Sequence, residues 1–392
     1  MDRLETDYQA AAEALFNYVE TNSTDQADAP MVLPASVYLD PDRWQREMDL
    51  IFKRLPLMLA LSCEMPNPGD YKAMDALGLP VLLARGKDGK VRAFLNVCPH
   101  RGAPVARQGH GNCNRFTCIY HGWTFANDGR LIAIADRKKF GDIDTSSRNL
   151  RELPCDEKAG MIFVILTPGM PMELEKFLGG MLPDLERLNL RDWHFCGTRV
   201  IHGANWKVAY DGYLEGYHFA AAHPNTIHPR TYSNVMHYEA YGPHMRTAYA
   251  QTSIPKLRDV PREKWGEMEN NGFDFVRTLF PNVSIFLAPE IGQIAQLMPG
   301  PTPDKNTTYL LYVSAKPPAD DAEAAQVEQM ITFFRDVTNN EDYLLGLDVQ
   351  KGLESGAIDT VVFGRNERGN QYFHRYVDYY LQNDPNAEPP KL

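Results

Sequence analysis

Two short cysteine–histidine pairs constrain this chain more than any other feature of its sequence. Residues 98–101 read Cys-Pro-His-Arg, and residues 118–123 read Cys-Ile-Tyr-His-Gly-Trp. A glycine follows each histidine by one or two residues, where a tight turn needs backbone freedom. Apolar alternation before the first pair and an Asn-Asp-Gly turn signal after the second indicate strands. We therefore predict that both pairs lie on loops of a small β framework.

The four side chains of these pairs are typical ligands of an iron–sulfur cluster. Four cysteines would indicate a plain [2Fe–2S] ferredoxin site, whereas histidine in place of cysteine on one iron is the Rieske arrangement. We therefore predict that Cys98 and Cys118 bind the inner iron of a Rieske [2Fe–2S] cluster and that His100 and His121 bind the outer iron. A zinc site is the alternative, but zinc fingers usually place both histidines on one helix, and no helical pattern surrounds these histidines.

Length and composition indicate an intracellular enzyme. A chain of 392 residues is long enough for two domains. The net charge of −11 argues against nucleic acid as a partner. The six cysteines are too scattered for a disulfide framework, and no apolar stretch reaches the length of a membrane span. We expect a cytoplasmic protein that binds neither nucleic acid nor membrane.

The order of apolar patterns predicts an α+β chain. Helical patterns precede a long region of short apolar runs and turns, and a mixed region of helices and strands follows. Helices are expected at 6–21, 41–54, 173–181, around 205–222 and over 320–353, with strands between 283 and 316. The predicted domains are N-terminal helices packing on the catalytic domain (1–45), an all-β Rieske domain (46–165), an α+β catalytic domain (166–382) and a tail (383–392).

A second group of histidines and carboxylates lies in residues 205–224. His218 and His223 are five residues apart, and on one helix Asp211, Glu215 and His218 would share a face. Two histidines and one carboxylate form the facial triad of non-haem Fe(II) oxygenases, which leaves coordination positions open for dioxygen. Histidines that only pack in a core are the alternative for this pair.

The missing carboxylate should come from residues 340–353. Asp342 begins an apolar-faced helical pattern and is the best candidate, and Glu341 is its immediate rival. An exposed first-turn carboxylate, favoured by the helix dipole, is the alternative interpretation of Asp342. The spacing alone does not decide between these roles.

Together, these motifs resemble the α (terminal oxygenase) subunit of the Rieske non-haem iron ring-hydroxylating oxygenases. The shared features are Asn-Trp-Lys at 205–207, the D/E-x-x-H-x-x-x-x-H spacing, and a late Asp before Val-Gln-x-Gly-Leu. The resemblance extends from about residue 35 to 380. It implies a catalytic domain with an antiparallel sheet and helices in a helix-grip-like arrangement, and it assigns His218, His223 and Asp342 as ligands of a mononuclear Fe(II).

The resemblance also implies a route for electrons. Glu215 occupies the position of the family's bridging carboxylate, which links a Rieske histidine of one subunit to an iron-ligand histidine of its neighbour in a head-to-tail homotrimer. Asp211, on the same predicted face, is the second candidate catalytic carboxylate. Many ring dioxygenases have Asp at the bridging position, and Glu there resembles carnitine-type and other amine monooxygenases. An α3β3 assembly with a small subunit is the alternative to the homotrimer.

The chain has no G-x-G-x-x-G after a strand, so we expect a separate ferredoxin or flavin reductase using NAD(P)H. With O2 as cosubstrate, the expected reaction is hydroxylation or oxidative N- or O-dealkylation of an aromatic or other hydrophobic small molecule, as in aromatic compound catabolism. The alternatives are a quaternary-amine (carnitine- or betaine-like) monooxygenase and a Rieske electron-transfer protein without oxygenase activity. Six apolar residues are candidates for the pocket lining: Phe273, Phe275, Phe280, Phe286, Ile294 and Leu297.

Overall fold

The computed structural model describes residues 3–392, so Met1 and Asp2 of the predicted N-terminal segment lie outside the described residues. The chain forms two compact units. The larger unit comprises the residues up to Ile51, Leu178–Leu185 and Trp193–Leu392, and the smaller comprises Phe52–Phe177 and Glu186–Asp192. The sequence instead placed the divisions at 45/46 and 165/166. The first division lies later because helical backbone continues from Pro41 through Phe52.

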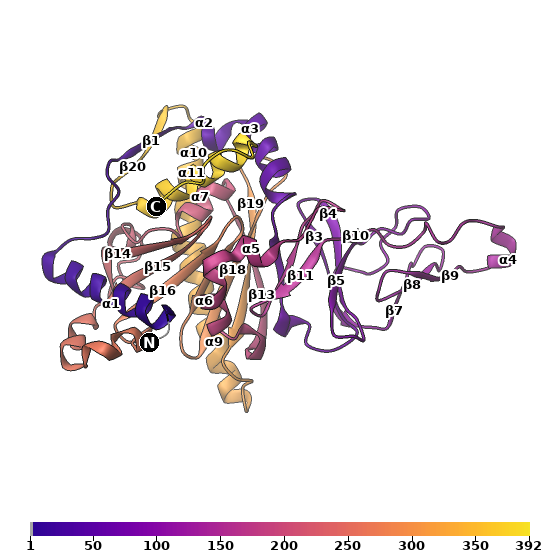
Figure 1. The fold of residues 1–392 in the computed structure, drawn as a ribbon, viewed down its shortest axis with the longest axis horizontal. Coiled ribbons are helices and arrows are strands. Elements are labelled where there is room, and N and C mark those ends of the chain that lie inside the picture. Colours follow the sequence, from indigo (N-terminus) through magenta and orange to yellow (C-terminus); the bar gives the residue numbers. More distant parts are fainter. Residues whose placement is uncertain (1–2) are drawn as a thin grey trace. The chain divides into compact units, whose positions relative to one another are not determined.

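The smaller unit is built from antiparallel strands, as expected for an all-β domain (Figure 1). Five strands form a sheet in the order β10-β5-β4-β3-β6, and two three-stranded sheets have the orders β11-β12-β2 and β7-β8-β9. The bounds are β2 (Leu57–Leu61), β3 (Asp70–Ala76), β4 (Leu79–Arg85), β5 (Val91–Leu95), β6 (Gly109–Asn112), β7 (Arg115–Thr117), β8 (Thr124–Ala126), β9 (Leu131–Ala133), β10 (Glu152–Leu153), β11 (Cys155–Lys158) and β12 (Met161–Val164).

The two cysteine–histidine segments follow β5 and precede β8. Cys98 and Cys118 belong to the same buried cluster as Phe94, Trp123 and Phe125. The loops that carry the predicted cluster ligands are therefore anchored in the core of this unit. All six cysteines of the chain are free, in agreement with the prediction that they form no disulfide framework.

The larger unit is organised around a seven-stranded antiparallel sheet with the order β13-β19-β18-β17-β16-β15-β14 (Figure 1). Its strands are β13 (His194–Gly203), β14 (Thr231–Tyr241), β15 (His244–Gln251), β16 (Phe273–Leu279), β17 (Val283–Leu287), β18 (Ile291–Pro299) and β19 (Asn306–Ser314). The last three confirm the strands predicted between 283 and 316. A separate two-stranded sheet pairs β1 (Met31–Pro34) with β20 (Thr360–Phe363).

Helices complete the larger unit. Their bounds are α1 (Arg3–Thr21), α2 (Ser36–Leu39), α3 (Pro41–Glu47), α7 (Trp206–Asp211), α8 (Phe219–Ala222), α9 (Asp321–Val337), α10 (Leu344–Glu354) and α11 (Arg368–Gln382). The helix α4 (Arg137–Phe140) belongs to the smaller unit, and the chain passes from one unit to the other within α5 (Leu174–Leu178) and within α6 (Leu182–Arg187). Within residues 3–392, no helix is long and apolar enough to cross a lipid bilayer.

The two faces of the seven-stranded sheet carry different elements because successive strand residues point to opposite sides. Phe273 and Phe275 of β16 pack in one buried cluster with Tyr8 and Leu15 of α1, and we call this side the α1 face. Asp274 and Val276 of the same strand line a cavity on the opposite side, the cavity face. The predicted N-terminal helix is thus confirmed, and its apolar residues cover the α1 face.

The single helix predicted around 205–222 is wrong. The chain forms α7 up to Asp211, then a non-helical connection, then the short α8 from Phe219. Glycines at 212 and 216 weaken a continuous helix, and the backbone at Gly216 passes so close to the Phe219 ring that an added Cβ would lie 2.8 Å from it. The Glu215 carboxylate accepts hydrogen bonds from the backbone N–H groups of Tyr217 and His218, which the interruption leaves without helical partners.

The long helical stretch predicted over 320–353 is confirmed, with one irregularity. A π-helical turn, Thr338–Tyr343, separates α9 from α10. Such turns are wider than an α-helical turn and occur frequently at functional sites. This one contains both Glu341 and Asp342, the two rival carboxylates of the sequence prediction.

Candidate metal centres

The two cysteine–histidine loops of the smaller unit have matching backbone conformations. In the first, the Cys98 N–H donates to the Ala103 carbonyl at 2.8 Å and the Gly102 N–H to the Cys98 carbonyl at 2.9 Å. In the second, the Cys118 N–H donates to the Trp123 carbonyl at 2.8 Å, and the glycine N–H after its histidine donates to the Cys118 carbonyl at 2.9 Å. Both glycines have positive φ, +84° and +69°, which explains their place in the motif.

The four predicted cluster ligands face one another. Cys98 and Cys118 are each 2% exposed, and the rings of His100 and His121 lie 4.6 Å apart between centroids. Burial raises the pKa of the Cys98 thiol, and the neighbouring Cys118 thiol raises it further. The Nδ1 atom of His100 is buried and has no hydrogen-bond partner within residues 3–392. Two adjacent thiols and an orphaned ring nitrogen fit a cluster held by two cysteines and two histidines.

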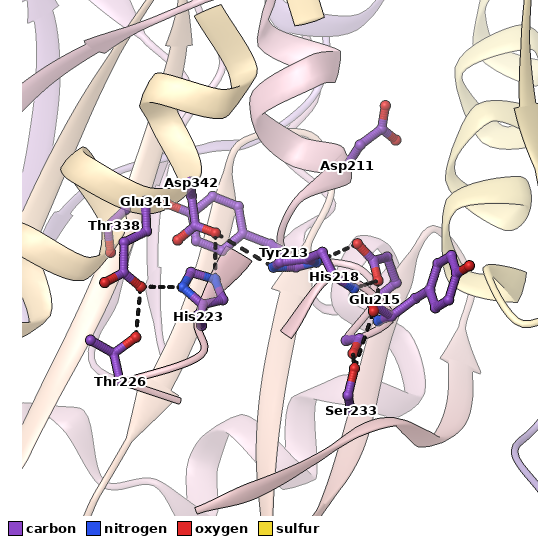
Figure 2. A network of polar contacts seen from close by, with 12 residues as sticks. Asp211, Tyr213, Glu215, His218, His223, Thr226, Ser233, Thr338, Glu341 and Asp342 are labelled. Carbon is purple, nitrogen blue, oxygen red and sulfur yellow. Dashed lines mark hydrogen bonds and ion pairs between the residues drawn. The ribbon is translucent and has the colours of Figure 1, made fainter. Parts of the chain in front are cut away.

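A second ligand group converges in the larger unit, where His218, His223 and Asp342 meet (Figure 2). His218 and His223 stand at the two ends of α8. The Oδ1 atom of Asp342 lies 2.9 Å from Nε2 of His223 and 3.5 Å from Nε2 of His218. One potential ligand atom from each residue lies within 4.8 Å of the others. We call these three residues the triad; two imidazoles and one carboxylate form the donor set of a facial non-haem iron site.

Each histidine of the triad also contacts a carboxylate through its other ring nitrogen. Glu215 forms a short hydrogen bond with Nδ1 of His218. Glu341 lies 2.5 Å from Nδ1 of His223 and accepts a hydrogen bond of 2.6 Å from the Thr226 hydroxyl. Metal-binding histidines are typically oriented by such contacts, which direct the opposite nitrogen toward the ion. The arrangement therefore fits an ion between the two Nε2 atoms and Asp342.

The charges of this site are unbalanced without a cation. Burial alone would lower the pKa of His218, but hydrogen bonds and charges from Asp342 and Glu215 raise it to about 10. Burial raises the pKa of Asp342, but the hydrogen bonds from His218 and His223 outweigh it and lower the pKa. Within residues 3–392, no lysine or arginine pairs with Glu215, Glu341 or Asp342. A divalent cation would supply the missing positive charge.

The structure distinguishes the two rival carboxylates. Asp342 faces Nε2 of His223, whereas Glu341 faces Nδ1 of the same ring. The wide π turn allows these consecutive side chains to reach the same imidazole from two sides. The sequence treated them as alternatives, but the structure gives them different positions.

Asp211 does not join this group. Its carboxylate accepts hydrogen bonds from the Tyr38 hydroxyl at 2.8 Å and from the Asn370 amide at 3.2 Å, and it lies 3.1 Å from Nε2 of His374. Figure 2 shows Asp211 directed away from the triad. The expectation that Asp211 shares a helix face with Glu215 and His218 is wrong because α7 ends at Asp211.

A cavity of about 190 Å³ adjoins the triad on the cavity face of the sheet. Of the six apolar candidates, only Phe286 lines it. The other five are buried in other parts of the core and at most 2% exposed: Phe273, Phe275, Phe280, Ile294 and Leu297. Strand alternation explains the error at Phe273 and Phe275, which point to the α1 face. The sequence interpretation missed Phe219, Tyr249, Asp274, Phe333 and Phe334 of the lining.

Two family models match the chain. The Rieske [2Fe-2S] domain matches residues 56–153, and the ring hydroxylating alpha subunit (catalytic domain) matches residues 190–383. The chain belongs to the Rieske ring-hydroxylating oxygenases, as an α subunit. It is therefore an oxidoreductase with a Rieske [2Fe–2S] domain and a mononuclear iron catalytic domain, which uses O2 as cosubstrate. The catalytic-domain match does not support an electron-transfer protein without oxygenase activity.

Relatives of this Rieske oxygenase include monooxygenases and dioxygenases. The carnitine monooxygenase oxygenase subunit of Escherichia coli (strain K12) is 29% identical over 366 residues, which is 88% of this chain and 92% of the relative. The anthranilate 1,2-dioxygenase large subunit of Burkholderia cepacia is 31% identical over 201 residues, which is 49% of this chain and 47% of that protein. These relatives show that the family prediction was correct.

Solved structures agree with this assignment. A quaternary ammonium Rieske monooxygenase in complex with L-carnitine has a TM-score of 0.75 and 25% identity, over 91% of this chain and 97% of that chain. Naphthalene 1,2-dioxygenase from Rhodococcus sp. has a TM-score of 0.74 at 19% identity, over 96% and 99% of the two chains; this likeness is in fold. Oxygenases of this family work with a separate reductase and are typically multimeric.

Proposed function

We propose that this terminal oxygenase holds Fe(II) with His218, His223 and Asp342 and oxidises a small molecule in the adjoining cavity. The observation that carries the proposal is the convergence of two Nε2 atoms and one carboxylate, with a further carboxylate at each Nδ1. Cys98 and Cys118 would hold the inner iron of the Rieske cluster, and His100 and His121 the outer iron. When bound, the two metal groups supply single electrons and the activation of dioxygen.

The protein's own side chains prepare this site. Glu215 and Glu341 accept the Nδ1–H of His218 and His223, which fixes the tautomer and directs Nε2 inward. His223 is 1% exposed, whereas His218 and Asp342 are partly exposed and leave an approach to the reacting centre. In this proposal Asp342 is the ligand, and Glu341 is a positioning residue.

Glu215 is the proposed crossing point for electrons between subunits. It contacts His218 and also lines an open groove of about 570 Å³, whose other lining residues come from α7, α10 and the segments next to them. Leu345 and Val349 of this groove are about half exposed, at 49% and 51%. An apolar rim around a carboxylate suits docking of a neighbouring subunit's Rieske domain in a homotrimer. A separate NAD(P)H-dependent ferredoxin or flavin reductase would supply the electrons; an α3β3 assembly is the second possibility.

Two substrate classes are in keeping with the cavity. Its aromatic lining suits an aromatic or hydrophobic molecule. The second class is a quaternary amine, which is favoured by the likeness to carnitine and glycine betaine monooxygenases and by glutamate at position 215. Cytoplasmic location and the predicted lack of nucleic-acid and membrane partners stay predictions from composition.

The iron content of purified protein tests the ligand assignment. We expect about three irons per chain, two in the cluster and one in the triad. Asp342→Ala should lose the mononuclear iron and oxygenase activity while the reduced-state EPR signal of the cluster stays. Asp336→Asn, a carboxylate near α9's end paired with Arg335, is the control. An Asp342→Ala protein that keeps all its iron would contradict the assignment.

A separate variant tests the electron route. Glu215→Gln preserves the size of the side chain and should keep both metals. Product formation should slow strongly because the carboxylate that links His218 to a Rieske histidine of the neighbouring subunit is lost. Oxygen uptake with a surrogate reductase and an iron count on the same sample give the result. Normal turnover with unaltered metal content would sink the bridging role.

A further inference from the structure

Asp274 is a carboxylate on the wall of the cavity beside the triad. It lies on β16, where Asp274 and Val276 point to the cavity face and Phe273 and Phe275 to the α1 face. Neither the triad nor the proposed electron route uses it. Its place in the cavity therefore calls for a separate explanation.

The contacts of Asp274 leave one carboxylate oxygen free. The Gln251 amide donates to Oδ1 at 2.8 Å, and the Asn270 amide, in the orientation that satisfies both of its atoms, donates to Oδ1 at 3.3 Å. Within residues 3–392, Oδ2 of Asp274 has no hydrogen-bond partner, and this oxygen is not fully buried. Asp274 lines the cavity, and we infer that the open oxygen Oδ2 faces it.

Among residues 3–392, no cationic side chain balances this carboxylate. In the described part of the chain, no lysine, arginine or histidine forms an ion pair with Asp274. Burial raises its pKa to about 6, against the opposing effect of the Gln251 hydrogen bond. The group is therefore mostly ionised near neutral pH, where an unpaired charge in a partly buried site is costly. A positively charged ligand would remove that cost.

Aromatic rings stand next to Asp274 and around the cavity. Tyr249 is its direct cross-strand neighbour in the register of β15 and β16, and the Phe219 ring lies 5.5 Å from the Tyr249 ring. The rings of Phe286 and Phe334, 5.7 Å apart, line the same cavity. The faces of such rings attract cations, including alkylated ammonium groups. The carboxylate and the rings thus favour the same kind of ligand.

Outside the triad, the described lining of the cavity offers no cation to a ligand carboxylate. Among the described residues that line it, none is a lysine or arginine, whereas Glu215, Asp274 and Asp342 are acidic. A substrate carboxylate placed beside Asp274, away from the triad's histidines, would meet a like charge. The cavity of about 190 Å³ is also small beside the roughly 300–1,000 Å³ of sites for drug-sized ligands.

We propose that Asp274 is a specificity-determining residue that binds the positively charged nitrogen of a small substrate which places no carboxylate in the cavity. The inference rests on the proposed function for the reacting centre, but the recognition of the cation is a property of Asp274 and its aromatic neighbours. It narrows the substrate class to small alkylammonium compounds.

Three probes of similar size test the proposal on the anaerobic holoenzyme. Choline carries the cation alone, 3,3-dimethylbutan-1-ol is its uncharged carbon isostere, and glycine betaine adds a carboxylate. Isothermal titration calorimetry should show that choline binds at least about tenfold more tightly than either other probe, a difference of about 1.4 kcal/mol. Equal affinities, tighter binding of glycine betaine, or no binding of choline would overturn the proposal.

Substitutions then locate the preference. Asp274→Asn keeps the shape of the side chain and should weaken choline binding by roughly 30-fold or more, as expected when a partly buried charge loses its partner. Binding of the uncharged isostere should stay the same, and Asp274→Glu should retain part of the preference for choline. Asp259→Asn, an exposed carboxylate outside the cavity, is the matched control. An Asp274→Asn protein that still prefers choline would contradict the assignment.

Measurements on the same samples distinguish a failure of the cation-binding proposal from a failure of the proposed function. The iron count and the reduced-state EPR signal report the metal sites, and calorimetry reports the cation preference without turnover. Protein with a missing mononuclear iron but an intact choline preference would contradict the ligand assignment alone. Should Asp274→Asn fail to fold, the wild-type preference among the three probes and Asp274→Glu still decide the question.

Discussion

The two faces of the seven-stranded sheet differ in the partners that they give to a buried carboxylate. On the α1 face, Asp184 is fully buried and accepts hydrogen bonds from Arg246 at 2.8 Å and from Arg277 at 2.7 Å, with a further bond from the Tyr8 hydroxyl. On the cavity face, Asp274 has amide partners and, among the described residues, no cationic one. One sheet therefore has a carboxylate neutralised by guanidinium groups on one face and, on the other, a carboxylate whose charge is not neutralised by the described side chains.

The pKa directions of the two groups follow from this difference. Burial acts to raise the pKa of Asp184, but the charges of Arg277 and Arg246 outweigh it and hold the pKa below its usual value. Burial raises the pKa of Asp274 to about 6, the charge of Glu269 acts in the same direction, and among the described residues no cation pairs with Asp274 to oppose them. Removing one member of a complete buried ion network destabilises the protein. A buried charge that has no partner destabilises the protein while it is present. The comparison teaches that the α1 face serves the fold and the cavity face serves a ligand.

The largest expected effect is a loss of stability when a carboxylate on the α1 face is replaced. Asp184→Asn would leave two buried guanidinium groups without their shared carboxylate and should destabilise the protein by about 3–5 kcal/mol. Chemical unfolding followed by circular dichroism measures the loss. Glu328→Gln removes the partner of Arg199 at an exposed pair, where such contacts contribute about 0–1 kcal/mol. A loss at Asp184 as small as that at Glu328 would erase the distinction between the faces.

The next effect concerns the carboxylates around the triad. Glu341→Gln should keep the fold but weaken binding of the mononuclear metal by roughly 10- to 100-fold, the usual result of removing a partner that orients a histidine ligand. Titration of the iron-depleted site with Fe(II) or Co(II) measures the affinity. Thr226→Val removes only the hydroxyl that donates to Glu341 and should have a smaller effect. Unchanged affinity in Glu341→Gln would mean that His223 needs no help from this carboxylate.

The smallest effect is a difference in pH dependence between the two faces. The folded-state pKa of Asp184 lies below the unfolded value of about 3.9, so its stabilisation is present above about pH 4 and is lost as the pH falls through the folded pKa. The folded-state pKa of Asp274, about 6, lies above the unfolded value. Its ionisation therefore costs stability above about pH 6, and the cost disappears as the pH falls toward about 4.

Thermal unfolding of one variant at two pH values tests this difference. Asp274→Asn should raise the Tm at pH 8 by roughly 2–4 °C, the shift that about 1 kcal/mol produces in a unit of this size. The increase should shrink at pH 5, where wild-type Asp274 is largely protonated. A Tm that falls at pH 8, or an increase independent of pH, would show that Asp274 is not a strained charge. A gain in stability together with a loss of choline binding is the expected sign of a functional residue.

The sequence by itself determined the family and predicted the Rieske ligands, because the chemistry of these loops is local. Cys98 and His100, like Cys118 and His121, are separated by one or two residues, and a positive-φ glycine completes each turn. Short spacing of this kind leaves little freedom for another arrangement. The same locality explains why the antiparallel strands of the sheet and the predicted N-terminal helix were confirmed.

Only the tertiary structure decided the different positions of Glu341 and Asp342, the separation of Asp211 from the triad, and the exposure of Asp274 to the cavity. Each of these facts depends on contacts between residues far apart in the chain, such as His223 with the π turn more than 100 residues later. A sequence pattern shows which side of a strand or helix a residue occupies, but not which charges meet it there. Asp184 meets two guanidinium groups and stabilises the fold, whereas Asp274 meets only amide groups and is available to a ligand.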